Sequence, residues 1–310
     1  MKHSATKGKI LVIRGGAIGD FILTLPAIAA LRKQFPDAHL EVLGYPHIAQ
    51  LAFAGGLVDR VQPIEARGLA GFFAPGGELA SDLADYFSEF DLIISYLYDP
   101  DGVFRMNLGR CVHGQFIQGP HRPDEKGSTH ATLVYLKPLE RLAIFDADPV
   151  PSLSLHATRN TQDVLALHPG SGSERKNWPE AKWAELLRHL VNATELNLLL
   201  VGGDAEGGRL NRLAAALPMA RTAVAQSRPL AELAGQLQSC AAFVGHDSGI
   251  THLAAALGLP TLVLWADAVE GIWRPQGERL ALIREVAGIC SISVERVAKE
   301  LSLMLADRPR

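Results

Sequence analysis

The sequence has no long apolar run, no excess of basic residues and no pair of cysteines at a recognisable spacing. A membrane-spanning helix needs about 20 consecutive apolar residues, so we expect at most peripheral contact with a membrane. Because 30 Lys and Arg stand against 33 Asp and Glu, we expect no nucleic-acid partner. The scattered cysteines suit a reducing compartment, and the polar first residues lack a signal-peptide core. We therefore expect a cytoplasmic protein, at most peripheral to the inner membrane.

Metal-binding and dinucleotide-binding signatures are missing as well. Neither the three cysteines nor the eleven histidines show a zinc spacing, so we expect no metal site. The dinucleotide fingerprint G-x-G-x-x-G fails at the first glycine turn, which has Gly15, Gly16 and Gly19. These absences argue against the common metalloenzyme and dinucleotide-dependent classes, and no cofactor is expected.

What the chain does contain is a regular alternation of apolar strands and amphipathic helices. Predicted strands lie at 10–13, 39–43, 92–98, 164–167, 196–201, 242–244 and 261–264. This alternation predicts an α/β fold with doubly wound parallel sheets. The 310 residues suffice for two domains, which we place at 1–155 and 156–310, with a linker at 149–160 and a terminal helix at about 293–305.

The most informative stretch is LALHPGSGSERKNWPEAKW, residues 165–183. A buried strand leads into a glycine-serine loop, two cations and a helix, for which Pro179 would be the first residue. One apolar helix face is predicted from Trp183, Leu186, Leu187, Leu190 and Val191. Since glycine-rich loops and helix N-termini favour anions, the expected ligand is a phosphate or diphosphate.

A similar turn, RGGAIGD at 14–20, follows the first predicted strand. Gly16 and Gly19 would let the chain turn sharply at the carboxyl end of the strand, where open α/β sheets bind ligands. Asp20 sits at the presumed helix start, and two interpretations stay open: an N-cap, or a general base that is ionised at neutral pH. Pro26 inside the following helical pattern predicts a kink or a late helix start.

A third stretch, FVGHDSGITHLAAAL at 243–257, again joins a strand to a helix. Asp247 and Ser248 are natural N-caps, and the N–H groups at Gly249 and Ile250 could hold a diphosphate. His252 lies one turn further along. Capping alone explains the serine but not the crowding of polar residues at this helix tip.

Three weaker signals remain. Glu206, after the Gly202-Gly203 turn, would reach a ribose hydroxyl, although such turns are common. The sequence Asp-Pro-Asp at 99–101 could hold a metal, but Asp-Pro-Asp-Gly is a common turn and we favour the turn. The irregular loops at 68–77 and 99–122, with their flanks, carry cations that suit an anionic acceptor or equally a solvated surface: Arg67, Arg105, Arg110 and Arg122.

Taken together, these motifs resemble glycosyltransferase family 9, the ADP-heptose:lipopolysaccharide heptosyltransferases. The matching pieces are Gly19-Asp20 with Pro26, HPG at 168–170, KNWPE at 176–180, Gly202-Gly203 and DSGITHLAAA at 247–256. The resemblance implies a GT-B fold, in which two Rossmann-like domains face each other across a cleft. It implies an acceptor-binding first domain, a second domain that binds the sugar nucleotide, and a C-terminal helix that crosses back.

The resemblance also implies roles for single residues. Asp20 falls on the catalytic base, and Lys176 falls on the cation that meets the phosphates. Asp247, Ser248, Gly249 and His252 fall on the diphosphate and sugar site. Apart from the resemblance, we also expect Ser171 and Glu206 to bind the nucleotide sugar. Two departures, Trp-Ala-Asp-Ala at 265–268 and Ala17-Ile18 before Gly-Asp, lie near the expected sugar.

The sequence thus favours an inverting, metal-independent glycosyltransferase. It would move a heptose or related sugar from an ADP-sugar to an anionic saccharide or lipid-linked acceptor, in synthesis of lipopolysaccharide core or a related cell-surface glycan. Two alternatives stay open: a non-catalytic nucleotide-binding protein, and a sugar-nucleotide epimerase of the same architecture.

Overall fold

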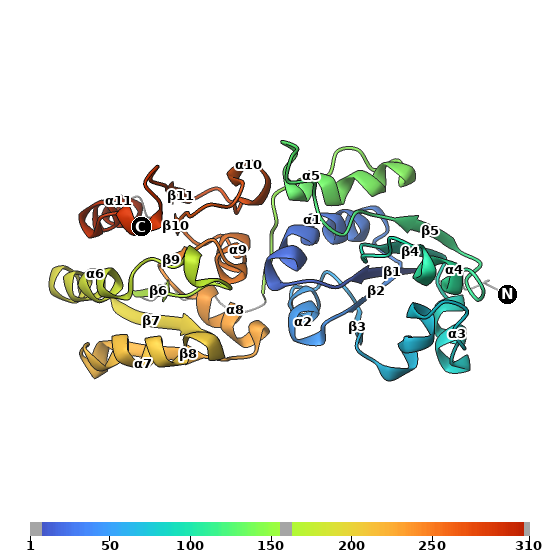
Figure 1. Cartoon of the computed structure of the whole chain (residues 1–310), viewed down its shortest axis with the longest axis horizontal. Helices are drawn as coiled ribbons and strands as arrows, with labels where there is room; N and C mark the ends of the chain where they lie inside the picture. Colours follow the sequence, from blue (N-terminus) through green and yellow to red (C-terminus); the bar gives the residue numbers. More distant parts are fainter. Residues whose placement is uncertain (1–7, 156–162, 307–310) are drawn as a thin grey trace. The chain divides into compact units, whose positions relative to one another are not determined.

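The computed structural model describes residues 8–155 and 163–306, so the predicted linker lies partly outside the described residues. The chain divides into two compact units, Met1–Pro149 and Val150–Arg310 (Figure 1). Each unit is built on one parallel sheet.

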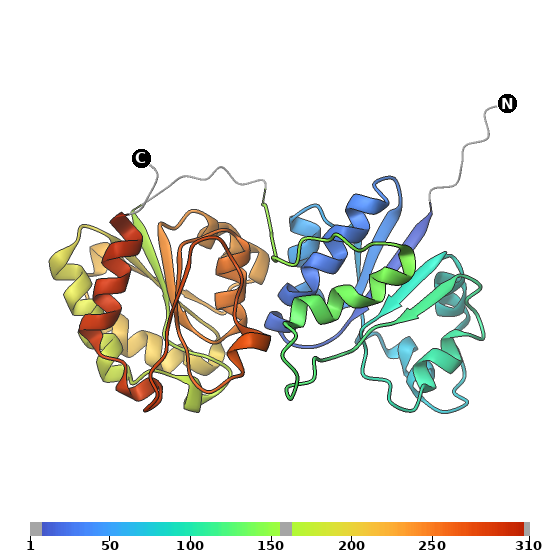
Figure 2. The ribbon, with the colours of Figure 1, turned by 90° about the horizontal axis from the view of Figure 1, so that it is seen from above.

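The sheet of the first unit has five strands in the order β3-β2-β1-β4-β5. They are β1 (Lys9–Arg14), β2 (His39–Gly44), β3 (Arg60–Pro63), β4 (Leu92–Ser95) and β5 (Gln115–Gln118). Helices α1 (Ile18–Gln34), α2 (Pro46–Ala54) and α5 (Ala131–Leu136) cover one face (Figure 2). The other face carries η1 (Arg67–Phe73), α3 (Ser81–Ser88) and α4 (Val103–Leu108), which share one apolar core.

The sheet of the second unit has six strands in the order β11-β10-β9-β6-β7-β8. They are β6 (Val164–His168), β7 (Asn197–Gly202), β8 (Thr222–Gln226), β9 (Ala242–His246), β10 (Thr261–Leu264) and β11 (Leu280–Ile283). Helices α6 (Glu180–Ala193), α7 (Gly207–Ala215) and α11 (Val294–Ala306) lie on one face, and α8 (Leu230–Gln238) and α9 (Gly249–Ala256) on the other (Figure 2). Short α10 (Glu270–Trp273) precedes β11.

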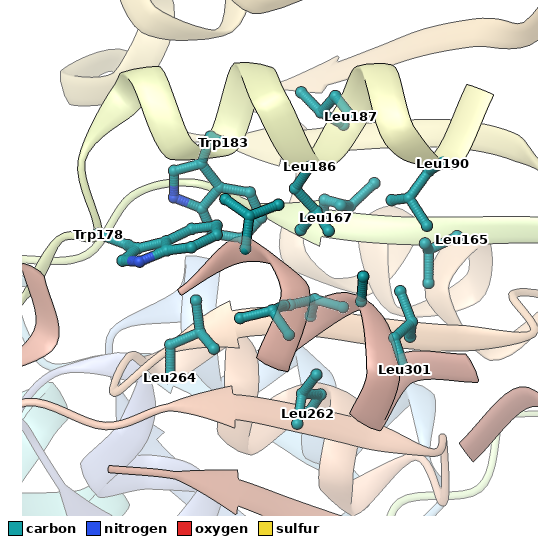
Figure 3. Packing of buried hydrophobic residues seen from close by; sticks show 14 of the residues in the cluster. Leu165, Leu167, Trp178, Trp183, Leu186, Leu187, Leu190, Leu262, Leu264 and Leu301 are labelled. Carbon is teal, nitrogen blue, oxygen red and sulfur yellow. The ribbon is translucent and has the colours of Figure 1, made fainter. Parts of the chain in front are cut away.

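The apolar face predicted for α6 is confirmed. Figure 3 shows Trp183, Leu186 and Leu190 reaching from α6 toward the strands, with Trp178 beside Trp183. All four side chains are buried, and the two indole rings meet edge to face at 5.3 Å between centroids. The prediction that Pro179 begins the helix is wrong by one residue: Pro179 has extended ψ and is the N-cap.

Two further predictions need correction. Helix α1 begins at Ile18 and continues through Pro26, so the prediction of a late start is wrong. The stretches predicted to be irregular contain η1, α4 and β5. Strands β3, β5, β8 and β11 were not predicted, and each is an edge strand of its sheet. An edge strand is only partly buried, so its sequence lacks the continuous apolar run that marks a central parallel strand.

The predicted terminal helix forms as α11 and packs against α6 in the second unit. Its buried residues Val294, Val297 and Leu301 repeat at helical spacing and join the core beneath α6. The expected crossing of this helix to the first domain stays a prediction.

Candidate active site

The motifs of the second unit that are predicted to bind a phosphate ligand meet at the topological switch point of its sheet. Strands β6 and β9 are neighbours, but the chain leaves β6 toward β7 and leaves β9 toward β10. Diverging connections open a crevice at the carboxyl ends of such strands, where ligands bind. His168 ends β6, and its Nδ1 lies 3.2 Å from Oγ of Ser248, just after β9. This hydrogen bond connects the loops that follow β6 and β9 at this edge of the sheet.

Lys176 and Asp247 form an ion pair between these loops. The Lys176 Nζ lies 2.5 Å from Oδ2 of Asp247. The lysine side chain is 38% exposed, whereas the aspartate is 8% exposed. The cation thus reaches the surface over a buried carboxylate, where it is available to an anionic ligand.

Helix α9 begins beside this pair. Ser248 is its N-cap, with Oγ accepting the Thr251 N–H at 3.3 Å, so Asp247 is not the cap. The N–H groups of Gly249 and Ile250 precede the first intrahelical donor, Thr251, and the helix leaves them for another acceptor. The structure therefore brings Lys176 and the positive end of α9 together. His252 is buried one turn further along.

Side chains within the loop after β6 hydrogen-bond to one another and to the loop backbone. The Oγ of Ser171 lies 2.8 Å from Asn177 Oδ1 and 2.8 Å from the Ser173 carbonyl oxygen. Ser171 is buried, so in this structure it holds the loop, and its contact with a ligand stays a prediction. Arg209 of α7 also binds this loop, although it was not predicted from the sequence. Its guanidinium donates to Pro169 O at 3.1 Å and to Glu174 at 2.8 Å.

Glu206 lies over the same edge of the sheet. Its Oε2 accepts the Gly203 N–H at 2.8 Å. A Cβ on Gly170 would lie only 2.1 Å from Cγ of Glu206, so the glutamate occupies the space that glycine leaves. Gly170, the last residue of the HPG motif, and the Glu206 carboxylate after β7 therefore depend on each other.

Two buried histidines end the central strands of this site. Burial lowers the pKa of His168 to about 3 and that of His246 to about 4. Both rings are therefore neutral at neutral pH, and they serve as hydrogen-bonding groups instead of as charges.

In the first unit, β1 and β4 form the corresponding switch point. Asp20 lies in the first turn of α1, and its Oδ2 accepts the Ala17 N–H at 3.1 Å. Ala17 is the N-cap, so Asp20 is not the N-cap; it is the third helical residue, which reaches back to the helix start. Gly16 has φ +101°, which only glycine adopts without strain, while Gly19 lies inside α1.

Arg14 lies behind Asp20 and was not singled out from the sequence. Its side chain is 2% exposed, and Nη1 donates to the His121 carbonyl at 2.8 Å. The guanidinium also lies 4.6 Å from the centroid of the Tyr135 ring. A buried arginine thus links the candidate base with the loop that follows β5.

The turn interpretation of Asp-Pro-Asp is confirmed. The Gly102 N–H donates to the Asp99 carbonyl at 3.2 Å, and the Asp99 carboxylate accepts the N–H groups of Phe104 and Arg105 at 3.1 and 3.0 Å. Asp99 therefore binds two N–H groups in the first turn of α4, whose N-cap is Gly102. Within the described part of the chain, no group of three or more His, Cys, Asp or Glu side chains could hold a metal ion. The metal requirement itself stays a prediction.

The four candidate acceptor residues differ in their surroundings. Arg67 and Arg105 are exposed on η1 and α4. Arg110 donates to Gly77 O at 2.7 Å, and Arg122 pairs with Glu125 at 2.5 Å. Arg110 thus contributes to loop structure, and acceptor binding by these residues stays a prediction. Over the described ranges, no helix has both the length and the apolar character needed to cross a membrane.

The sequence profile of glycosyltransferase family 9 (heptosyltransferase) matches residues 145–303, which include all the motifs of the second unit described above. The chain belongs to glycosyltransferase family 9. It is 26% identical over 297 residues to lipopolysaccharide heptosyltransferase 1 of Salmonella typhimurium, covering 85% of this chain and 90% of that protein. This family 9 member is therefore a glycosyltransferase.

Solved structures support the same assignment at the level of the fold. The ADP-heptose lps heptosyltransferase II of E. coli has a TM-score of 0.79 at 19% identity, with 96% of this chain and 98% of that chain covered. The E. coli heptosyltransferase WaaC with ADP has a TM-score of 0.77 at 19% identity, covering 96% and 99%. The family 9 chain thus has the GT-B fold predicted from its sequence.

Proposed function

We propose that this family 9 glycosyltransferase moves a heptose or related sugar from an ADP-sugar to an anionic saccharide or lipid-linked acceptor in lipopolysaccharide synthesis. The observation that carries the proposal is the meeting of Lys176 with the N-terminus of α9 at the β6/β9 switch point. One of the structural relatives holds ADP, and relatives over most of the chain are lipopolysaccharide heptosyltransferases. We place this activity in the cytoplasm or at the inner-membrane surface.

In the proposed reaction, Asp20 takes the proton of an acceptor hydroxyl while that oxygen bonds to the anomeric carbon. The bond between this carbon and the ADP oxygen breaks on the opposite face, so the sugar configuration inverts. Negative charge grows on the departing diphosphate, where Lys176 and the N–H groups at Gly249 and Ile250 stabilise it. Preorganised charges of this kind are commonly the largest contribution to catalysis.

The proposal includes metal independence, because Lys176 and the α9 N-terminus supply the positive charge that a metal supplies elsewhere. Glu206 would accept a hydrogen bond from a ribose hydroxyl, and Ser171 and His252 would complete the donor site. Turnover that is lost in EDTA and restored by Mg²⁺ or Mn²⁺ would contradict this part alone.

The decisive experiment measures ADP release from ADP-heptose with and without a Kdo-containing lipopolysaccharide precursor. We expect release only when the acceptor is present, together with a heptosylated product. Sugar-nucleotide isomerisation without an acceptor would indicate an epimerase. ADP binding without either reaction would indicate a non-catalytic nucleotide-binding protein.

A further inference from the structure

His246, the last residue of β9, makes two backbone hydrogen bonds from one ring. Its Nε2 accepts the Trp178 N–H at 2.9 Å, and its Nδ1 faces the Gly170 carbonyl oxygen at 3.0 Å. An atom that accepts an N–H carries no proton of its own, so the proton of the neutral ring is on Nδ1 and is donated to Gly170. The side chain is fully buried. The two partners thus select one tautomer.

The two partners of this ring bracket the loop that carries Lys176. Gly170 stands at the beginning of the loop and Trp178 at its end, and both are buried. Between them the loop is closed by Ser171 and Asn177 and by the 3-10 turn η3 (Glu174–Lys176). Without the ring, a buried N–H and a buried C=O would each lose a hydrogen-bond partner, which is costly.

The surroundings keep the ring neutral and fixed. Trp183 meets it edge to face, with 5.4 Å between ring centroids. Burial is the main cause of its lowered pKa, and the Arg209 cation acts in the same direction. The hydrogen bond to the Gly170 carbonyl and the carboxylates of Asp247 and Glu174 oppose this shift. The neighbouring His168 is itself buried and neutral. A second proton would place an N–H against the Trp178 N–H and break the contact.

Resting on the proposed function, we propose that His246 is a positioning residue: its neutral ring sets the 170–178 loop, and thereby places Lys176 at the diphosphate end of the donor site. The histidine side chain has no exposed surface, so in this role it does not contact the donor or the acceptor. It acts through the loop in two ways. The ring of His246 binds both ends of the 170–178 loop, which carries Lys176. The next residue, Asp247, forms the ion pair with Lys176.

Two substitutions separate the ring's hydrogen bonds from its volume. His246→Leu removes both bonds, whereas His246→Gln restores one acceptor and one donor on a planar amide. We expect the Leu variant to bind ADP about tenfold to a hundredfold more weakly, the effect of misplacing a charge-assisted contact. Its KM for the donor should rise and its kcat should fall, as expected for the loss of Lys176 itself, and the Gln variant should recover most of the affinity and rate.

ADP binding is measured by calorimetry, with thermal unfolding as the check on folding. His130→Leu is the matched control, since His130 is a buried histidine of the first unit that caps α5. It should lower stability and leave ADP affinity unchanged. A folded His246→Leu protein with wild-type ADP affinity would overturn the positioning role. Wild-type protein that binds no ADP would overturn the proposed function, and this inference with it.

A spectroscopic measurement keeps the inference open to refutation should the Leu variant not fold. Histidine ring ¹⁵N shifts, assigned by the signal missing from His246→Gln, report the tautomer directly. We expect the Nδ1–H form, with no titration above about pH 5, below the ordinary histidine pKa. An Nε2–H tautomer, or a midpoint near the ordinary value, would contradict the contacts on which the inference rests.

Discussion

The guanidinium of Arg14 and the carboxylate of Asp20 lie together in the first unit, with Nη2 3.6 Å from Oδ1. The same nitrogen donates to the Asp20 carbonyl at 3.3 Å, while the other carboxylate oxygen accepts the Ala17 N–H. Arg14 is buried, but the Asp20 side chain is 29% exposed. The Asp20 carboxylate is therefore fixed by Arg14 and the Ala17 N–H and is still accessible to solvent, as a general base requires.

Asp20→Asn should separate the base from the helix-start contact. The amide oxygen can still accept the Ala17 N–H, so thermal stability should change little. It cannot take a proton, and kcat should fall by about 10²–10⁴, the usual value of general-base catalysis. ADP affinity should be retained. The test measures steady-state kcat and calorimetric ADP affinity for the variant and the wild type. A kcat near the wild-type value would show that Asp20 is not the base and has only a structural role.

Arg14→Met should reduce both stability and kcat. The substitution removes a buried cation that bonds the His121 carbonyl and neighbours Asp20, so we expect a loss of about 1.5–3 kcal/mol in the free energy of unfolding. Arg32→Met is the control, because Arg32 also binds backbone carbonyls and pairs with Asp59, away from α1's first turn. Urea unfolding and kcat are measured for both. If kcat falls equally in the two variants, Arg14 has no special link to the base.

Lys176→Ala should weaken donor binding and slow transfer together. It removes a positive charge that meets the diphosphate before and during bond breaking, so both ADP affinity and kcat should fall about tenfold to a hundredfold. Lys182→Ala is the matched control: Lys182 donates to the Cys290 and Ile292 carbonyls and should affect stability only. Equal ADP affinity for Lys176→Ala and wild type would exclude the phosphate contact.

Gly170→Ala should act through Glu206. The new methyl group would overlap Cγ of Glu206 and displace the carboxylate, so ADP affinity should fall about tenfold, as it should for Glu206→Ala. In the double variant Cγ is gone and the methyl group fits, so the two effects should not add. Calorimetry with ADP and 2′-deoxy-ADP measures the coupling and the ribose contact. Additive effects would show that Gly170 matters for another reason.

The buried histidines predict how stability depends on pH. Burial lowers the pKa of His168 to about 3 and of His246 to about 4 in the folded chain. When the pH falls below the ordinary histidine value of about 6.5, the unfolded chain takes up protons that the folded chain does not, so stability decreases. The slope should approach about 1.4 kcal/mol per pH unit for each histidine.

Urea unfolding between about pH 6.5 and 4.5 tests this, a window above the range in which most carboxylates titrate. His246→Gln should flatten the slope by about half, because it removes one of the two histidines whose pKa is lowered by burial. The control His189→Gln, at a residue exposed on α6, should leave the slope unchanged. Stability that is flat over this window would show that these rings are protonated in the folded state.

The central strands and the order of the motifs could be predicted from the sequence, because each depends on residues that are neighbours along the chain. Strands such as Ile10–Ile13 and Thr261–Leu264 are buried on both faces, and continuous apolar runs reveal them. The apolar spacing of α6 likewise predicts the face that packs inward. The edge strands β3 and β8 were missed because their residues are only partly buried.

The order of residue types along the chain already specifies which chemical groups follow each strand: a carboxylate after β1, cations after β6 and a helix N-cap after β9. How these groups pair depends on the packing of the strands in three dimensions. Lys176 and Asp247 are far apart along the chain, as are Arg14 and His121, and the parallel strand order brings them together. A hydrogen bond or ion pair depends on distance in space, which a pattern of residue types along one chain does not contain.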